Sequence, residues 1–312
     1  MKQTLHQLAQ KVDTGVPLSG GERRAVLQWF GQSSVYFPTE EETQRAQSAL
    51  LWLARQPSEI SSSTFAQACS LPEDAAAQIL DRWTAQADRP QPVIIGIEGL
   101  DGSGKTVQAE RLRAALCKTG KTVLVLDFPQ YSSFFGKEIG ALLSGKDGAT
   151  AMELDGKSMC LWYAIDRWDI IHKLPLERYD YVIFNRYVLS NAVYQTARGC
   201  GGYDRAFLEG VFALEHPRRK LPGPDVYLYF DTQASVTGEN VLKKGQRAYV
   251  EGLDVYERSQ DLLTRCHGLY RRLAAEIEEV QVVPCMDADG TLRPIEDIHE
   301  QALAVLNERG LL

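Results

Sequence analysis

Residues 99–106 read GLDGSGKT, directly after a short apolar run and directly before an amphipathic segment. The stretch matches the pattern G-x-x-x-x-G-K-[ST] at every fixed position, and a strand before it and a helix after it are the context of a P-loop. Its glycines let backbone N–H groups turn toward phosphate oxygens, at positions where a Cβ would obstruct the ligand. The sequence therefore predicts a phosphate-binding loop for a nucleotide.

The side chains of this loop have distinct expected tasks. Lys105 is expected to reach the β- and γ-phosphates of ATP, and the Thr106 hydroxyl is expected to bind Mg²⁺, the predicted cofactor. A helix predicted over 105–117 directs its positive N-terminal end at the same phosphates. The residues that we assign to the ATP site are Gly99, Asp101, Gly102, Ser103, Gly104, Lys105, Thr106 and Val107.

Short apolar runs alternate with amphipathic segments after residue 91, which is the pattern of an α/β protein with a parallel sheet. The runs are rich in β-branched and aromatic residues, as expected for strands covered by helices on both faces. We predict an α/β fold of the P-loop NTPase type, with a five-stranded parallel sheet flanked by helices. The predicted strands are 93–97, 122–127, 181–184, 226–230 and 280–284.

The chain before residue 91 has a helical pattern without a convincing strand, and two prolines within residues 88–92 indicate a linker. Ser19 and Glu22 predict a capping box that opens a helix through Phe30. Residues 18–24, LSGGERR, resemble the signature of ABC-type ATPases. In those proteins the signature follows the P-loop, whereas here it precedes the P-loop, so we interpret the stretch as the start of this helix.

Residues 63–83 predict two helices around Ser70-Leu71-Pro72, an outline that resembles the helix-turn-helix of winged-helix domains. Residues 1–90 contain eight Lys or Arg and ten Asp or Glu, and this net charge of -2 argues against DNA contact. We predict a small helical N-terminal domain over 1–90, whose role the sequence leaves open, and a P-loop domain over 91–312.

The bulk composition excludes several classes of protein. The net charge of -7 argues against a dedicated nucleic-acid binder, because phosphate backbones are held by excess Lys and Arg. The six cysteines contain no C-x-x-C pair, so neither a zinc site nor a disulfide framework is indicated. No apolar run approaches the roughly 20 residues that span a bilayer, and the polar N-terminus lacks a signal-peptide core. We expect a cytoplasmic protein without a membrane or nucleic-acid partner.

P-loops serve GTPases, motor ATPases and kinases, so the acceptor must be sought elsewhere in the chain. No N-K-x-D element is present, which disfavours a GTPase. Within residues 158–174, Tyr163 and Arg167 would lie together on one helix side, where a ring and a guanidinium suit a nucleobase. An ordinary surface contact between residues i and i+4 is the alternative. The opposite side carries an apolar stripe that we predict to face the core, formed by Leu161, Ala164, Ile165, Trp168 and Ile171.

Polar residues follow the predicted third strand, at the sheet edge where open α/β sheets bind ligands. Arg186 comes directly after this strand and would bridge the donor and acceptor phosphates, with Asn191 and Tyr194 close behind. The second strand runs into Phe128 and Tyr131 at the same edge. Plain packing is the alternative interpretation of these two aromatic residues.

Taken together, these segments resemble the thymidylate kinase family from residue 93 to the C-terminus. The stretches that match in order and spacing are IEGLDGSGKT (97–106), FPQY (128–131), AIDRW (164–168), NRYVLSNAVY (185–194) and LPGPDVYLYFD (221–231). The resemblance implies a kinase domain that transfers the γ-phosphoryl group of ATP to dTMP. A related or modified pyrimidine deoxynucleoside monophosphate remains an open alternative acceptor.

The same resemblance implies where the acceptor binds. The implied contacts are Phe128, Pro129, Tyr163 and Arg167 around the thymine, Asn191 on its edge, Asp101 at the 3′-hydroxyl, Tyr194 at the 2′ position, Arg186 and Tyr131 at the acceptor phosphate, and Asp254 and Glu257 near the site. These two acidic residues are expected to open the long helix after a lid over 237–253. Catalysis is expected to depend on positioning and on the cations Lys105, Arg186, Lys244 and Arg247.

Three positions depart from the family pattern. Asn185 stands where the family has an Asp close to Mg²⁺, and an uncharged amide is a weaker ligand for a hard cation. Gln130 and Asn240 stand where many relatives have Arg. The departures leave a second hypothesis open, a degenerate kinase fold that binds nucleotide and signals through its N-terminal domain. We expect an active kinase and a homodimer.

Overall fold

The computed structural model describes residues 4–31, 36–56, 60–86, 92–145, 148–199, 203–216, 221–236 and 253–312. Its centre is a sheet of five parallel strands in the order β2-β3-β1-β4-β5. The predicted α/β class is confirmed, and each predicted strand agrees with an observed one to within one residue at either end. The strands are β1 Val93–Glu98, β2 Val123–Asp127, β3 Tyr181–Asn185, β4 Val226–Asp231 and β5 Val280–Pro284.

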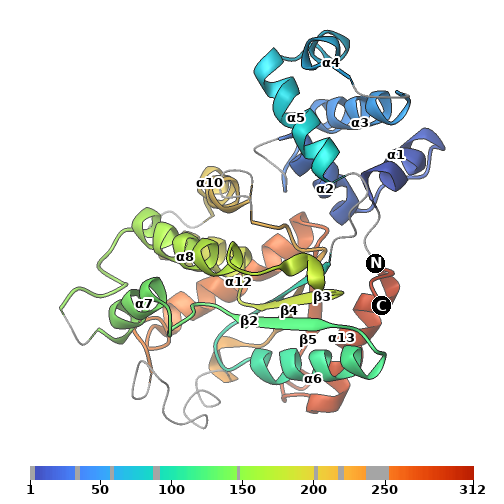
Figure 1. The fold of residues 1–312 in the computed structure, drawn as a ribbon. Coiled ribbons are helices and arrows are strands. Elements are labelled where there is room, and N and C mark those ends of the chain that lie inside the picture. Colours follow the sequence, from blue (N-terminus) through green and yellow to red (C-terminus); the bar gives the residue numbers. More distant parts are fainter. Residues whose placement is uncertain are drawn as a thin grey trace.

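Helices cover both faces of this sheet (Figure 1). On one face, α6 (Lys105–Lys118) and α13 (Ile295–Glu308) pack against the β1 side chains of Val93, Ile95 and Ile97. Ile94 points to the other face, which is covered by helices from later in the chain. The helices on that side are α8 (Gly156–Ile171), α9 (Val188–Arg198), α10 (Arg205–Glu215) and α12 (Gln260–Glu276), with α7 (Phe134–Ser144) beside α8.

One predicted helix face is only partly right: Ala164 and Ile171 of the expected stripe are buried. In α8, Leu161 and Trp168 of the expected core-facing stripe have 43% and 40% of their surface exposed. Arg167, predicted on the opposite side, is buried as well, beside Asp166. The buried side of α8 is therefore mixed, because Asp166 and Arg167 face the polar loop and cavity wall while Met159, Cys160, Ala164 and Ile171 are buried in the core.

The N-terminal helices precede the sheet, and their capping boxes fix where they begin. Ser19 accepts a hydrogen bond from the Glu22 backbone N–H while the Glu22 carboxylate accepts one from the Ser19 N–H, which confirms the predicted helix start. Ser70 in left-handed conformation and Pro72 separate α4 from α5, as predicted. The predicted linker lies largely outside the described residues. The helices are α1 Leu5–Asp13, α2 Gly20–Phe30, α3 Glu40–Ala54, α4 Ser62–Cys69 and α5 Glu73–Gln86.

This N-terminal region packs against the covered face of the sheet through buried polar contacts. Arg24 of α2 lies 3.2 Å from the Glu279 carboxylate before β5, and both side chains are buried. The Tyr36 ring packs against that of Phe212 of α10, with centroids 4.2 Å apart and the ring planes tilted by 40°. Because removing one partner of a buried ion pair leaves an uncompensated charge, Arg24 and Glu279 depend strongly on each other.

His216 joins α10 to the N-terminal region inside this interface. Its Nδ1–H donates to the Leu221 carbonyl at 3.2 Å, so its Nε2, 3.0 Å from the Tyr36 hydroxyl, accepts. Burial lowers the pKa of His216 from 6.5 to about 3, since the charged imidazole would lose its hydration. The imidazole is therefore neutral in the folded protein at neutral pH.

No described helix has the length and apolar character needed to cross a membrane. The five described cysteines, Cys69, Cys117, Cys160, Cys266 and Cys285, are unpaired thiols.

The low pKa of His216 predicts a pH-dependent stability. A histidine whose folded pKa is depressed contributes stability above its unfolded pKa, and this contribution is lost as the pH falls from 6.5 toward 3. Between pH 7 and pH 5 we expect His216 to reduce the free energy of unfolding by roughly 2 kcal/mol. Urea unfolding at the two pH values measures it. His216→Asn should reduce the difference in the free energy of unfolding between the two pH values by this amount. His172→Asn, at an exposed histidine, should leave that difference unchanged.

Candidate active site

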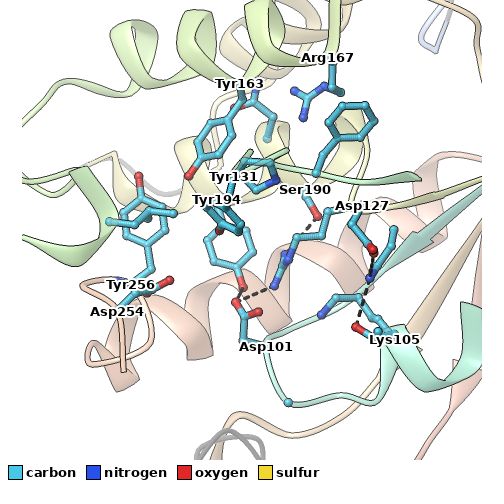
Figure 2. A pocket seen from close by; sticks show the side chains of 18 of the residues that line it. Asp101, Lys105, Asp127, Tyr131, Tyr163, Arg167, Ser190, Tyr194, Asp254 and Tyr256 are labelled. Carbon is cyan, nitrogen blue, oxygen red and sulfur yellow. Dashed lines mark hydrogen bonds and ion pairs between the residues drawn. The ribbon is translucent and has the colours of Figure 1, made fainter. Parts of the chain in front are cut away.

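A cavity of about 500 Å³ opens at the carboxyl ends of β1, β2 and β3 (Figure 2). Parallel strands end at one edge, so the loops that follow them meet there. Most of the residues assigned from the sequence line this cavity, while Gly99, Ser103 and Gly104 belong to the loop beneath it. The assigned residues in the lining are Asp101, Gly102, Lys105, Thr106, Val107, Phe128, Pro129, Tyr131, Tyr163, Arg167, Arg186, Asn191, Tyr194 and Asp254.

The P-loop forms the floor of this cavity between β1 and α6. Gly99 has a φ of +142°, and a Cβ there would lie 2.8 Å from the Phe230 carbonyl oxygen, so only glycine fits. Lys105 is buried, and its Nζ donates a hydrogen bond to the Leu100 carbonyl at 2.5 Å. This contact holds the ammonium group against the loop whose N–H groups are expected to cradle phosphates.

Arg186 reaches into the cavity from the end of β3 and is held on several sides. Its guanidinium lies 2.6 Å from the Asp101 carboxylate and 3.3 Å from the Ser190 hydroxyl, over the Tyr194 ring. Burial opposes its charge, but the neighbouring Asp101 raises the pKa of Arg186 well above its ordinary value. Its backbone φ of +65° is rare for a residue other than glycine, and such backbone strain is concentrated at functional sites.

Arg167 enters the opposite wall from α8 and forms a buried ion pair. Its Nε and Nη2 donate to the two carboxylate oxygens of Glu215, each at 2.5 Å. Asn191 of α9 donates to the same carboxylate at 2.8 Å. Glu215 is fully buried and cancels the charge of Arg167, which leaves the guanidinium as a neutralised set of hydrogen-bond donors.

The loop after β2 is fixed by a carboxylate of α8. The two oxygens of Asp166 accept hydrogen bonds from the Gln130 backbone N–H at 2.9 Å and from the Ser133 hydroxyl at 2.8 Å. Phe128 has only 4% of its surface exposed, and its ring packs 6.0 Å from that of Phe184. Packing and pocket lining therefore coexist at Phe128, where the sequence left the two as alternatives.

Asp254 and Glu257 lie in a turn and do not open the long helix, because α12 begins only at Gln260. The Asp254 carboxylate accepts hydrogen bonds from the backbone N–H groups of Tyr256 and Glu257, each at 2.9 Å. Asp254 lines the cavity, whereas Glu257 is not among its lining residues. The expected secondary structure is wrong for both, while the role of Asp254 stays a prediction. The lid residues Lys244, Arg247 and Asn240 lie outside the described residues.

Sequence reasoning missed several residues of the site. Glu215 was overlooked because nothing near it in the chain indicates that it meets Arg167, 48 residues earlier. Asp127 was placed only as a strand end, although it lines the cavity. Gln195 and Tyr256 also line the cavity. Nothing in the sequence indicates this for Gln195, although it directly follows Tyr194.

Comparison with known proteins supports the resemblance carried by these segments. The family model described as thymidylate kinase matches residues 97–301. The chain belongs to the thymidylate kinase family. A thymidylate kinase from Mycobacterium tuberculosis is 34% identical over 190 residues, which are 59% of this chain and 86% of that protein. A probable thymidylate kinase from Methanocaldococcus jannaschii is 28% identical over 218 residues, or 69% and 95% of the two chains.

A solved structure agrees with the fold. The thymidylate kinase from Candida albicans superposes with a TM-score of 0.55 at 22% identity and covers 71% of this chain and 93% of its own. This thymidylate kinase, an ATP-dependent nucleoside monophosphate kinase, thus carries an additional helical region before the part matched by the family model.

Glu215 provides a test of how the acceptor wall is built. Glu215→Gln removes the charge partner of Arg167, so the guanidinium must regain hydration or shift. We expect kcat/KM for dTMP to fall by about tenfold to a hundredfold, with the KM for ATP little changed. Steady-state kinetics with each substrate varied in turn measures both. Glu209→Gln, at an exposed ion pair on the same helix, is the control, and an unchanged dTMP response in Glu215→Gln would refute the role.

Proposed function

We propose that the cavity in Figure 2 transfers the γ-phosphoryl group of ATP to dTMP, giving ADP and dTDP. The observation that carries this proposal is a single cavity that holds the P-loop Lys105 at one end and the Arg167 wall at the other, with Arg186 among its lining residues. In-line transfer needs donor and acceptor phosphates to meet end to end, and Arg186 lies where it would contact both.

The acceptor base would lie against the α8 wall. Phe128 and Tyr163 offer rings for stacking, and Arg167 offers N–H donors for the base edge. Asn191 donates its amide hydrogens to Glu215 and to the Cys160 carbonyl, so it would offer its Oδ1, which has no hydrogen-bond partner in the part of the chain that the structure describes, as an acceptor. Since Glu215 already neutralises Arg167, this wall suits an uncharged base rather than an additional phosphate. Thymine is uncharged at neutral pH and presents carbonyl oxygens to such donors.

The sugar would lie between the P-loop and α9. The Tyr194 hydroxyl donates to Asp101 at 3.4 Å, so the ring and the carboxylate form one surface beneath the sugar. Asp101 would accept a hydrogen bond from the 3′-hydroxyl, and the Tyr194 ring would leave little room for a 2′-hydroxyl. This arrangement supports a deoxynucleotide as the acceptor.

The chemical step would rest on cations rather than on a general base. The acceptor phosphate has a second pKa near 6 and is largely dianionic at neutral pH, so it needs little help to attack. Lys105 and Arg186 would stabilise charge on the transferring group, joined by Lys244 and Arg247 of the lid. Closure of the lid would exclude water from the site.

Mg²⁺ is the cofactor that this site would use, and the donor set fits it. The Thr106 hydroxyl lines the cavity beside the Asn185 side chain, whose Oδ1 is buried without a hydrogen-bond partner among the described residues. Mg²⁺ takes oxygen ligands and is usually bound through one or two protein groups plus substrate phosphates. Bound there, it would neutralise charge on the β- and γ-phosphates of ATP.

We also propose the division into a helical domain over 1–90 and a kinase domain over 91–312, supported by the absence of strands among the described residues before β1. The homodimer and the cytoplasmic location remain predictions; a mass twice that of the chain by light scattering would support the dimer.

We do not adopt the degenerate alternative, since Lys105, Thr106 and Arg186 are all present in the cavity.

Lys105→Ala tests the proposed reaction. Because Lys105 would neutralise the β- and γ-phosphates in the transition state, we expect ADP release with dTMP to fall by about a thousandfold or more. A coupled assay for ADP measures the rate, and circular dichroism checks the fold. Lys118→Ala, at an exposed lysine in the last turn of the same helix, should retain full activity. Substantial turnover by folded Lys105→Ala would rule out this mechanism.

A further inference from the structure

Asn185 ends β3 at the position where the family has a carboxylate, and its partner in the neighbouring strand is acidic. In the β2–β3 ladder, Asp127 is the residue directly paired with Asn185. Both strands end at these residues, so the two side chains occur side by side at the edge of the sheet that carries the P-loop. The carboxylate missing at one strand end is thus present at the other.

The contacts bring these two residues together with the P-loop threonine. Asn185 Nδ2 donates to Asp127 Oδ1 at 2.5 Å and lies 3.3 Å from Thr106 Oγ1. Figure 2 shows the Asp127 carboxylate above the start of α6, within the same cavity as Lys105. Asn185 therefore links the Asp127 carboxylate directly to the hydroxyl that is expected to bind Mg²⁺.

Two other carboxylates near the P-loop are held by a cation or by buried hydrogen-bond donors, whereas Asp127 accepts one hydrogen bond from the neutral Asn185 amide. Asp101 lies 2.6 Å from the Arg186 guanidinium. Glu98 is fully buried and accepts hydrogen bonds from the Tyr187 N–H, the Ser190 hydroxyl and the Tyr270 hydroxyl. Asp127, by contrast, is exposed to the cavity. It is the carboxylate at this edge that a metal ion entering with ATP would meet.

We propose that Asp127 supplies the carboxylate for the Mg²⁺ of Mg²⁺–ATP, in place of the family's Asp at position 185. The carboxylate thus lies at the end of β2 and not at the end of β3, and the Asn185 amide connects it to Thr106. A hard cation prefers a charged oxygen ligand, and one carboxylate with a hydroxyl and phosphate oxygens is a common set for Mg²⁺. This proposal deepens the proposed function and rests on it.

The proposal accounts for the Asn185 departure from the family pattern. An Asp at 185 beside Asp127 would place two carboxylates in direct contact, and like charges at that distance repel. Asn185 removes the repulsion and donates an N–H to the remaining carboxylate. The competing explanation is that Asp127 merely accepts this hydrogen bond at an exposed strand end and has no role toward the metal.

A charge-swap series with a binding readout separates the two explanations. The variants are Asp127→Asn, the double variant Asp127→Asn/Asn185→Asp, and Asp261→Asn as a control of equal charge change at an exposed side chain of α12. Titration calorimetry would measure binding of the non-hydrolysable analogue AMP-PNP with Mg²⁺ and with EDTA. Electron paramagnetic resonance of Mn²⁺ would measure metal binding in the presence of the same analogue.

In the wild type and in Asp261→Asn we expect tighter AMP-PNP binding with Mg²⁺ than with EDTA. Asp127→Asn should weaken Mn²⁺ binding by about tenfold or more and lose the Mg²⁺-dependent gain, while binding in EDTA is retained. The double variant should regain the metal response, because it restores one carboxylate at the same edge; it also controls for a folding defect of the single variant.

An undiminished metal response in Asp127→Asn, or a double variant that stays as defective as the single one, would overturn the assignment. Turnover of dTMP by the wild type, measured on the same preparation, distinguishes this from a failure of the proposed function. If the wild type turns over dTMP while Asp127→Asn keeps its metal response, only the metal assignment falls. A wild type without metal response and without turnover would overturn both.

Discussion

The parallel pairing of β1 with β3 is the constraint on which the site depends. Ile97 is paired with Asn185, and the Arg186 N–H continues the ladder by donating to the Ile97 carbonyl at 2.9 Å. This register brings the P-loop after β1 and the strained Arg186 after β3 to the same edge. The buried Glu98 carboxylate fastens the arrangement, because it accepts from the backbone N–H of Tyr187 and from Tyr270 of α12.

The charged side chains at this edge are held by specific partners. Asp101 accompanies Arg186, Glu215 accompanies Arg167, and Asn185 bridges Asp127 to Thr106. Pairing offsets the desolvation cost of the buried cations and sets the direction of each donor. The Arg167–Glu215 wall is thus suited to an uncharged base, while Arg186 and the P-loop form a separate region suited to phosphates.

The N-terminal region contacts the structure close to the acceptor wall. His216, which accepts from Tyr36, directly follows Glu215, which holds Arg167. Arg24 reaches Glu279 beside β5, so the region is attached at two sites on the same face of the sheet. Gly20 and Gly223 lie at this interface, where a Cβ would come within 3 Å of the ends of Glu279 and Gln28, so a larger residue at either would displace these side chains.

The sequence by itself determined the P-loop, the five strands, the capped helices and the family, because each depends on residues close together in the chain or on spacing that repeats. Tertiary structure alone decided the buried side of α8, the ion pair of Arg167 with Glu215 and the meeting of Asp127 with Asn185. A helix whose buried side mixes polar and apolar residues departs from the rule that apolar residues face inward. Pairs formed across 48 or 58 residues leave no local pattern, since only strand order and helix packing bring their side chains together.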